Sequence, residues 1–95
     1  MALLKCTDVS EGLRASEATV TIEEHDGTSQ FFPIDRGVLS DIGGVSYLSV
    51  RLIHLNDARG IALVGLPVEA DSGVNRIWAR YEDFLENPAV PELAR

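Results

Sequence analysis

The chain has few residues that could serve as a nucleophile and its general base. It contains one cysteine, Cys6, and two histidines, His25 and His54, which stand far from one another in the sequence. A histidine activates a cysteine only where the fold brings the two side chains together. The Gly-x-Ser-x-Gly turn that presents a nucleophilic serine is also missing from the sequence. We therefore predict no catalytic residues from the sequence.

Metal ligands and phosphate-binding loops are equally sparse. The densest group is Glu23–Asp26, in which Glu23 and His25 would share one face of a strand. A carboxylate and an imidazole could hold a divalent ion there, but we interpret the segment as a solvated hairpin tip. Gly43 and Gly44 precede a predicted strand and lack the lysine of a phosphate-binding loop. We expect no metal and no cofactor.

One set of residues has the composition of a recognition surface. Alternation along the segment 75–80 places Arg76, Trp78 and Arg80 on one face of a predicted strand. Tryptophan and arginine are enriched at the energetic centres of protein interfaces. An arginine stacks on an indole ring and still binds a partner's carboxylate. In the other interpretation, Trp78 caps the core and the two arginines extend over it.

The elements that would position these residues are short strands separated by turns. From Ala18 to Glu23 the chain alternates between apolar and polar residues and is rich in β-branched side chains, which predicts a strand. Asp26 and Gly27 then predict a tight hairpin turn. The partner strand, residues 30–34, contains Pro33, which favours a position at the edge of a sheet.

The longest predicted strand, Val45–Leu55, places Tyr47 and Ile53 on its outward face and His54 at the end of its inward face. Ile61–Leu66 is apolar on both faces and predicts the central, most buried strand. The other predicted elements are a strand at Leu3–Val9, a loop with one helical turn at Asp35–Gly44, a last strand at Asn75–Arg80 and a short helical turn within Tyr81–Asn87.

These elements predict one mostly-β domain at residues 1–87 with a short C-terminal helical turn, followed by a flexible tail at 88–95. Five or six short antiparallel strands would form a small barrel or a strongly bent sheet. The order of long strand, turn, strand, loop, strand and terminal helical turn resembles the architecture of SH3-like barrels. That architecture supports many unrelated functions, so the resemblance implies a fold and no activity.

Charge and composition exclude several classes of partner. The net charge is −7, with 15 acidic residues against 8 lysines and arginines. Such a charge repels nucleic acid and anionic lipid, and we expect neither as a partner. The chain has no apolar run of membrane-spanning length and no signal-peptide pattern. Because a single cysteine allows no intrachain disulfide, we expect a cytoplasmic protein.

The residues taken together predict a non-enzymatic module for binding another protein or a second copy of itself. The expected partner-binding residues are Arg76, Trp78, Arg80, Tyr47 and Ile53. The alternative is a small enzyme or ligand-binding protein with a site at a barrel mouth, lined by Cys6, His25 and His54. A third interpretation is a fragment of a larger assembly that docks through residues 88–95.

Overall fold

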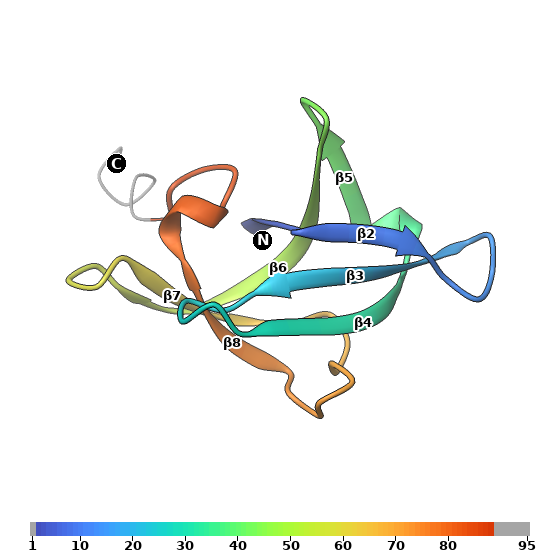
Figure 1. Cartoon of the computed structure of the whole chain (residues 1–95). Helices are drawn as coiled ribbons and strands as arrows, with labels where there is room; N and C mark the ends of the chain where they lie inside the picture. The colour runs from blue at the N-terminus through green and yellow to red at the C-terminus, as the bar shows by residue number, and fades with distance from the viewer. Residues whose placement is uncertain (1, 89–95) are drawn as a thin grey trace.

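Residues 2–88, which the computed structural model describes, fold into eight strands in two antiparallel sheets (Figure 1). The mostly-β fold predicted from the alternating pattern is therefore confirmed. The strands are β1 (Ala2–Lys5), β2 (Asp8–Glu11), β3 (Glu17–Glu23), β4 (Ser29–Asp35), β5 (Leu39–Ile42), β6 (Val45–Asn56), β7 (Ile61–Gly65) and β8 (Arg76–Arg80). Two 3₁₀ turns accompany them, η1 (Arg36–Val38) and η2 (Tyr81–Asp83).

The smaller sheet contains β2, β3 and β4 in that order. The inward residues of β3, namely Ala18, Val20 and Ile22, are fully buried, as their alternation predicts. Gly27 adopts a φ of +90° in the turn between β3 and β4, a conformation that glycine reaches without steric cost. Pro33 lies within β4, which is an edge strand of this sheet. The predicted hairpin and the edge position of Pro33 are both confirmed.

The larger sheet is built around the long strand β6. The first half of β6 pairs with β1 and β5, and its second half pairs with β7. β8 pairs with β7 and completes the order β1-β6-β7-β8. In β7, Leu63 is half-buried and the other four residues are buried, and Ala62 and Val64 have no exposed surface. This burial confirms the prediction of a central strand at this position.

The two sheets share one apolar core. β1 leads directly into β2 and carries the chain from the larger sheet to the smaller one. At this crossing the amide of Cys6 donates to the carbonyl of Ser46 in β6, and the amide of Thr7 donates to the carbonyl of Thr21 in β3. The largest fully buried side chains come from both sheets: Leu4, Val20, Ile22, Phe32, Leu48, Val50, Val64 and Ile77.

On the opposite side, the sheets meet through single hydrogen bonds. The amide of His25, in the turn after β3, donates to the carbonyl of Trp78 in β8 at 2.7 Å. The amide of Asp71, in the loop between β7 and β8, donates to the carbonyl of Phe31 in β4 at 2.9 Å. Within residues 2–88 these bonds do not extend into a ladder, so the sheets do not close into a barrel. Of the two predicted forms, a small barrel or a strongly bent sheet, the barrel is therefore not confirmed.

Two predicted elements differ from the structure, and the strand count exceeds the five or six expected. The predicted strand Leu3–Val9 is divided, because the chain changes sheets within it. The predicted loop at Asp35–Gly44 contains a strand at Leu39–Ile42 after its helical turn. Gly43 and Gly44, with φ of +61° and +82°, form a two-residue turn whose twist suits a hairpin with β6.

The C-terminal helical turn is present as η2. After η2 the chain runs beside β1. Phe84 forms an antiparallel bridge with Leu4, and the amide of Leu85 donates to the carbonyl of Leu3. Apart from Pro88, the predicted tail lies outside the described residues. Within the described part of the chain, no helix combines the length and apolarity needed to cross a membrane.

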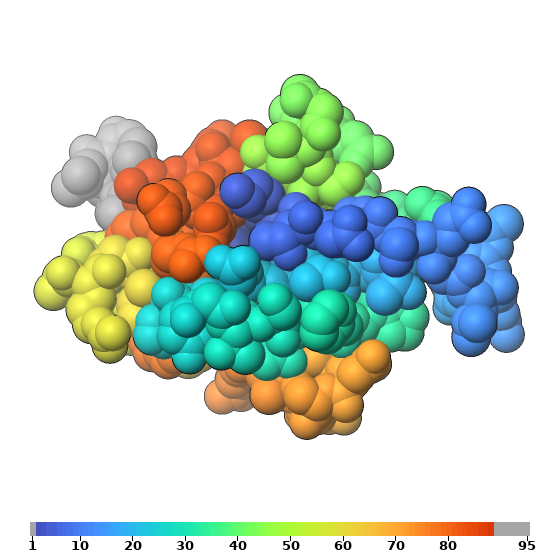
Figure 2. Space-filling view, viewed as in Figure 1, coloured from blue at the N-terminus to red at the C-terminus, as the bar shows by residue number. Residues whose placement is uncertain are grey.

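Several hairpins and loops project from the body of the molecule. Figure 2 shows the β5–β6 hairpin at the top, the β6–β7 hairpin at the left and the β7–β8 loop at the bottom. The loop between β2 and β3 extends to the right in the same view. The smaller sheet faces the viewer, and β6 to β8 lie behind it (Figure 1).

Candidate functional site

The alternation of β8 places Trp78 on the outer face of the larger sheet. Ile77 and Ala79 point into the core and are almost fully buried. Arg76, Trp78 and Arg80 point the other way, where Arg76 is exposed and the other two are half-buried. The indole N–H of Trp78 donates to no residue in the described range 2–88. Trp78 is thus an outer-face residue, outside the core between the sheets.

Trp78 belongs to a row of side chains that crosses three strands. It stands directly opposite Leu63 in β7, which stands opposite His54 in β6. Directly paired residues of antiparallel strands point to the same face of a sheet. The rings of His54 and Trp78 meet edge to face, with centroids 6.1 Å apart and planes at 89°. We call His54, Leu63 and Trp78 the central row.

A second row, next to the central one, brings two arginines to the same face. Gly65 of β7 pairs with Arg51 of β6 on one side and with Arg76 of β8 on the other. A Cβ atom on Gly65 would lie 3.1 Å from Nη2 of Arg51, so the guanidinium group lies over the glycine. Neither arginine side chain bonds or ion-pairs with any described residue. We call Arg51, Gly65 and Arg76 the basic row.

Arg80, on the other side of the central row, is held by acidic groups of its own molecule. Its guanidinium group forms an ion pair with Glu23 of β3. Its Nε lies 3.2 Å from Asp83 and 3.6 Å from Glu82, both in η2. The hydrogen bond to Glu23 and the nearby charge of Asp83 raise the pKa of Arg80. We call Arg80 and these three carboxylates the acidic end.

A neighbouring contact ties η2 to the β6–β7 hairpin. The hydroxyl of Tyr81 donates to Asp57 at 2.5 Å, and the amide of Tyr81 donates to the carbonyl of Gly60. Burial and the hydrogen bond to Asp57 raise the pKa of Tyr81 to about 12. These bonds fix the position of η2, and with it the two carboxylates that η2 contributes to the acidic end.

The structure separates Tyr47 from the other predicted partner-binding residues. Tyr47 pairs with Lys5 and Ser40, in the half of β6 that does not contact β7. It precedes His54 by seven residues, which is about 23 Å along a strand. Ile53 lies beside His54 with 38% of its surface exposed. Of the five predicted residues, Arg76, Trp78, Arg80 and Ile53 lie in or next to one face, and Tyr47 does not.

A β-bulge overturns the inward position expected for His54. The register between β6 and β7 shifts between Leu52 and His54, with Ile53 as the extra residue. A bulge of this kind turns the following side chain to the other face. His54 is therefore exposed and joins the central row. The sequence carries no marker for this bulge, because Val45–Asn56 lacks both glycine and proline.

Sequence reasoning also missed Arg51, Leu63 and Gly65 as members of the face. The one signal available was Gly65, a glycine inside an otherwise apolar strand. Such a glycine often marks a close approach of another group to the backbone. Here the approaching group is the guanidinium of Arg51.

Cys6 and His54 of the alternative site lie far apart. Cys6 is bonded through its amide to Ser46, which is eight residues, or about 26 Å along a strand, from His54. Burial and the charge of Asp41 raise the pKa of Cys6 to about 11, which disfavours the reactive thiolate. The backbone of His25 lies next to that of Trp78, because the amide of His25 donates to the carbonyl of Trp78. Among residues 2–88, no three His, Cys, Asp or Glu side chains gather as metal ligands.

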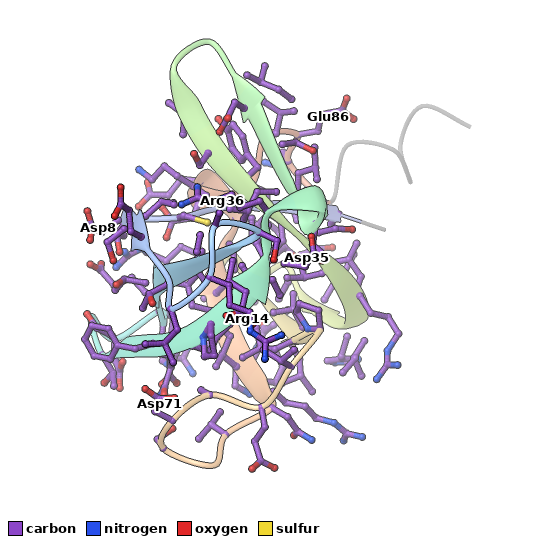
Figure 3. The ribbon with its side chains drawn as sticks, turned by 90° about the vertical axis from the view of Figure 1, so that its right-hand side faces the viewer. Asp8, Arg14, Asp35, Arg36, Asp71 and Glu86 are labelled. Carbon is purple, nitrogen blue, oxygen red and sulfur yellow. The ribbon has the colours of Figure 1, made fainter. Side chains whose placement is uncertain are left out.

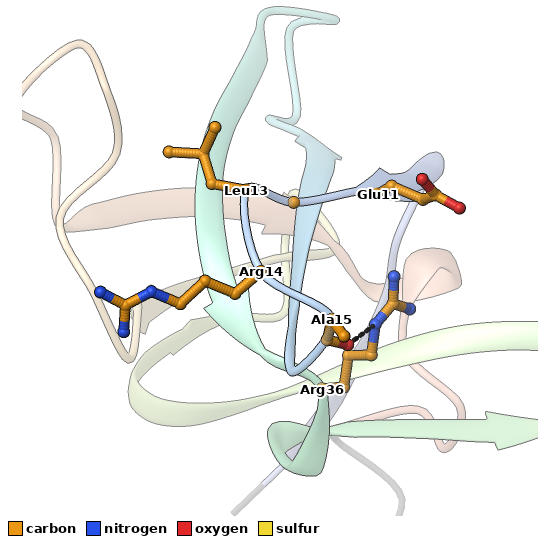
Figure 4. A pocket seen from close by; sticks show the side chains of 6 residues that line it. Glu11, Leu13, Arg14, Ala15 and Arg36 are labelled. Carbon is orange, nitrogen blue, oxygen red and sulfur yellow. Dashed lines mark hydrogen bonds between the residues drawn. The ribbon is translucent and has the colours of Figure 1, made fainter.

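A shallow hollow of about 420 Å³ lies at the loop between β2 and β3. In Figure 4, Leu13 and Arg14 point away from Arg36, whose Nε donates to the carbonyl of Ala15 at 3.1 Å. Leu13 is fully exposed. Figure 3 looks onto this end of the molecule, with Arg14 near the middle and Asp8 and Asp71 at the periphery. The divergence of these side chains leaves the hollow without converging polar groups for a small ligand.

No family model, curated protein or solved structure matches this chain. The outer face of β6, β7 and β8 therefore has to be interpreted from its own geometry and charge.

Proposed function

We propose that this domain is a non-enzymatic interaction module that binds another protein, with a second copy of itself as the simplest partner. The binding surface is the outer face of the larger sheet, made of the central row, the basic row and Ile53. The observation that carries the proposal is the half-exposed Trp78 beside two arginines that are unpaired within the described residues.

The energetics of the basic row support this proposal. Arg51 and Arg76 stand on the two strands that flank β7, about 10 Å apart, and their like charges repel one another. Arg51 and Arg76 have no carboxylate of their own molecule to offset that repulsion among the described residues. A partner that supplies carboxylates would gain charge-assisted hydrogen bonds there. The adjacent indole of Trp78 would add apolar area that is desolvated on binding.

We also propose that the fold is a partly open relative of the SH3-like architecture. The proposal is supported by η2, after which Phe84 and Leu85 pair with β1. A reducing, cytoplasmic compartment is proposed from the single, buried thiol of Cys6. The net charge of −7 supports a protein partner over nucleic acid or a membrane surface.

The proposal is tested by the solution mass of the protein from micromolar to millimolar concentration. We expect the wild type to self-associate and Trp78→Ala to remain monomeric with an unchanged circular dichroism spectrum. Phe31→Ala is the matched control, because Phe31 is an aromatic residue 49% exposed on the smaller sheet, and should behave as the wild type. Self-association that persists in Trp78→Ala would contradict the assignment of this face.

A further inference from the structure

The charge on the outer face is arranged along the strands from positive to negative. The basic row stands at one end, with Arg51 and Arg76 unpaired in the described part of the chain. The acidic end stands at the other, where three carboxylates surround the single guanidinium of Arg80. Trp78 lies midway between Arg76 and Arg80, about 7 Å from each along β8.

Two of the three carboxylates of the acidic end, those of Glu82 and Glu23, remain accessible to a partner although they contact Arg80. The side chain of Glu82 is 78% exposed and that of Glu23 is 33% exposed. Three carboxylates against one guanidinium leave a net negative charge at this end. It is opposite in sign to the basic row, and the uncharged residues Leu63 and Trp78 lie between them.

A face with this arrangement is complementary to itself. Consider a two-fold axis that lies in the interface and runs along the central row, across the strands. This axis reverses the strand direction in the second copy. The acidic end of the second copy then lies against the basic row of the first. Both charged contacts form at once, because each copy contributes the same surface. Leu63 and Trp78 of the two central rows meet near the axis, where interface residues are most fully desolvated.

We infer that the partner of this face is a second copy of the chain, docked face to face about a two-fold axis. Arg51 and Arg76 of each copy then bind Glu82 and Glu23 of the other. The inference rests on the proposed function and names the partner that the charge pattern selects. A uniformly acidic ligand would suit the basic row but would be repelled by the acidic end, and a second copy meets both ends with the opposite charge.

A charge exchange tests this arrangement. In the proposed dimer, position 76 of each copy faces position 82 of the other. Arg76→Glu alone or Glu82→Arg alone therefore places like charges against one another at both contacts. Each variant alone should weaken dimerisation about tenfold or more at low salt. An equimolar mixture of the two variants should form a heterodimer of near wild-type affinity, because both charged contacts are again between opposite charges. The double variant should likewise recover as a homodimer. Sedimentation equilibrium measures all four species.

Controls of the same charge change separate the specific contact from the change in net charge. Arg14→Glu lies in the exposed loop between β2 and β3, and Glu11→Arg lies at the exposed end of β2. Neither should affect dimerisation more than twofold, and their mixture should show no recovery.

Three results would overturn the inference: a monomeric wild type, single variants that dimerise normally, or a mixture that fails to recover. If the single variants dimerise normally or the mixture fails to recover, the Trp78→Ala variant decides what is rejected. Loss of the dimer in Trp78→Ala would retain the proposed face and reject only the two-fold charge pairing. A dimer that is unaffected by Trp78→Ala rejects the proposed function itself.

Discussion

Cys6 is the only thiol of the chain, and its surroundings keep it protonated. Burial and the charge of Asp41 raise its pKa from 9.0 to about 11. The thiolate population near neutral pH is then about a hundredfold lower than for an ordinary thiol. Because the folded pKa is raised, the contribution of Cys6 to stability is fully present below pH 9.0 and is lost as the pH rises through about 11.

We therefore expect alkylation of Cys6 by iodoacetamide at pH 8 to be about a hundredfold slower in the native protein than in urea. The native rate should increase tenfold per pH unit up to about pH 11. Mass spectrometry of labelling time courses measures both quantities. Equal rates in the native and unfolded protein would show an accessible, ordinary thiol and would reopen a role for Cys6 in chemistry.

At the scale of elements, β7 supports both the core and the outer face. Val64 has no exposed surface and packs in the core, while Leu63 and Gly65 of the same strand belong to the face. We expect Val64→Ala to lower the free energy of unfolding by about 2–4 kcal/mol through lost burial and a residual cavity. Denaturant titration measures the change.

The control for Val64→Ala is Leu13→Ala, because Leu13 is fully exposed in the loop between β2 and β3. Its substitution should change stability by less than about 0.5 kcal/mol. A similarly small effect of Val64→Ala would mean that β7 is not the central strand, and the position of the face on it would have to be reconsidered.

Strands and tight turns could be predicted from the sequence because they depend on local signals. The alternation of Ala18–Glu23 and the glycine at position 27 each fix a backbone conformation within a few residues. The strand Leu39–Ile42 was missed because its partner is set by the hairpin with β6, and its own residues also fit a helical spacing. The bulge at Ile53 was missed because it depends on the pairing between β6 and β7.

At the scale of the whole molecule, the net charge indicated which partners to exclude but not where the charges gather. Arg51 and Arg76 lie 25 positions apart in the sequence and become neighbours only through their common pairing with Gly65. Arg80 was predicted as a partner-binding residue from its alternation with Trp78. Its ion pairs with Glu23 and Asp83 depend on how the two sheets and η2 are arranged, which no local pattern contains.

The central claim is that the outer face of β6 to β8 is the surface through which this protein binds a second copy. The single tryptophan makes the indole N–H of Trp78 an unambiguous reporter in NMR spectra recorded from micromolar to millimolar concentration. We predict that this signal and the amide signals of His54 and Leu63 shift together as the concentration rises, while that of Phe31 on the smaller sheet does not. An indole signal that is independent of concentration, or shifts confined to the smaller sheet, would contradict the claim.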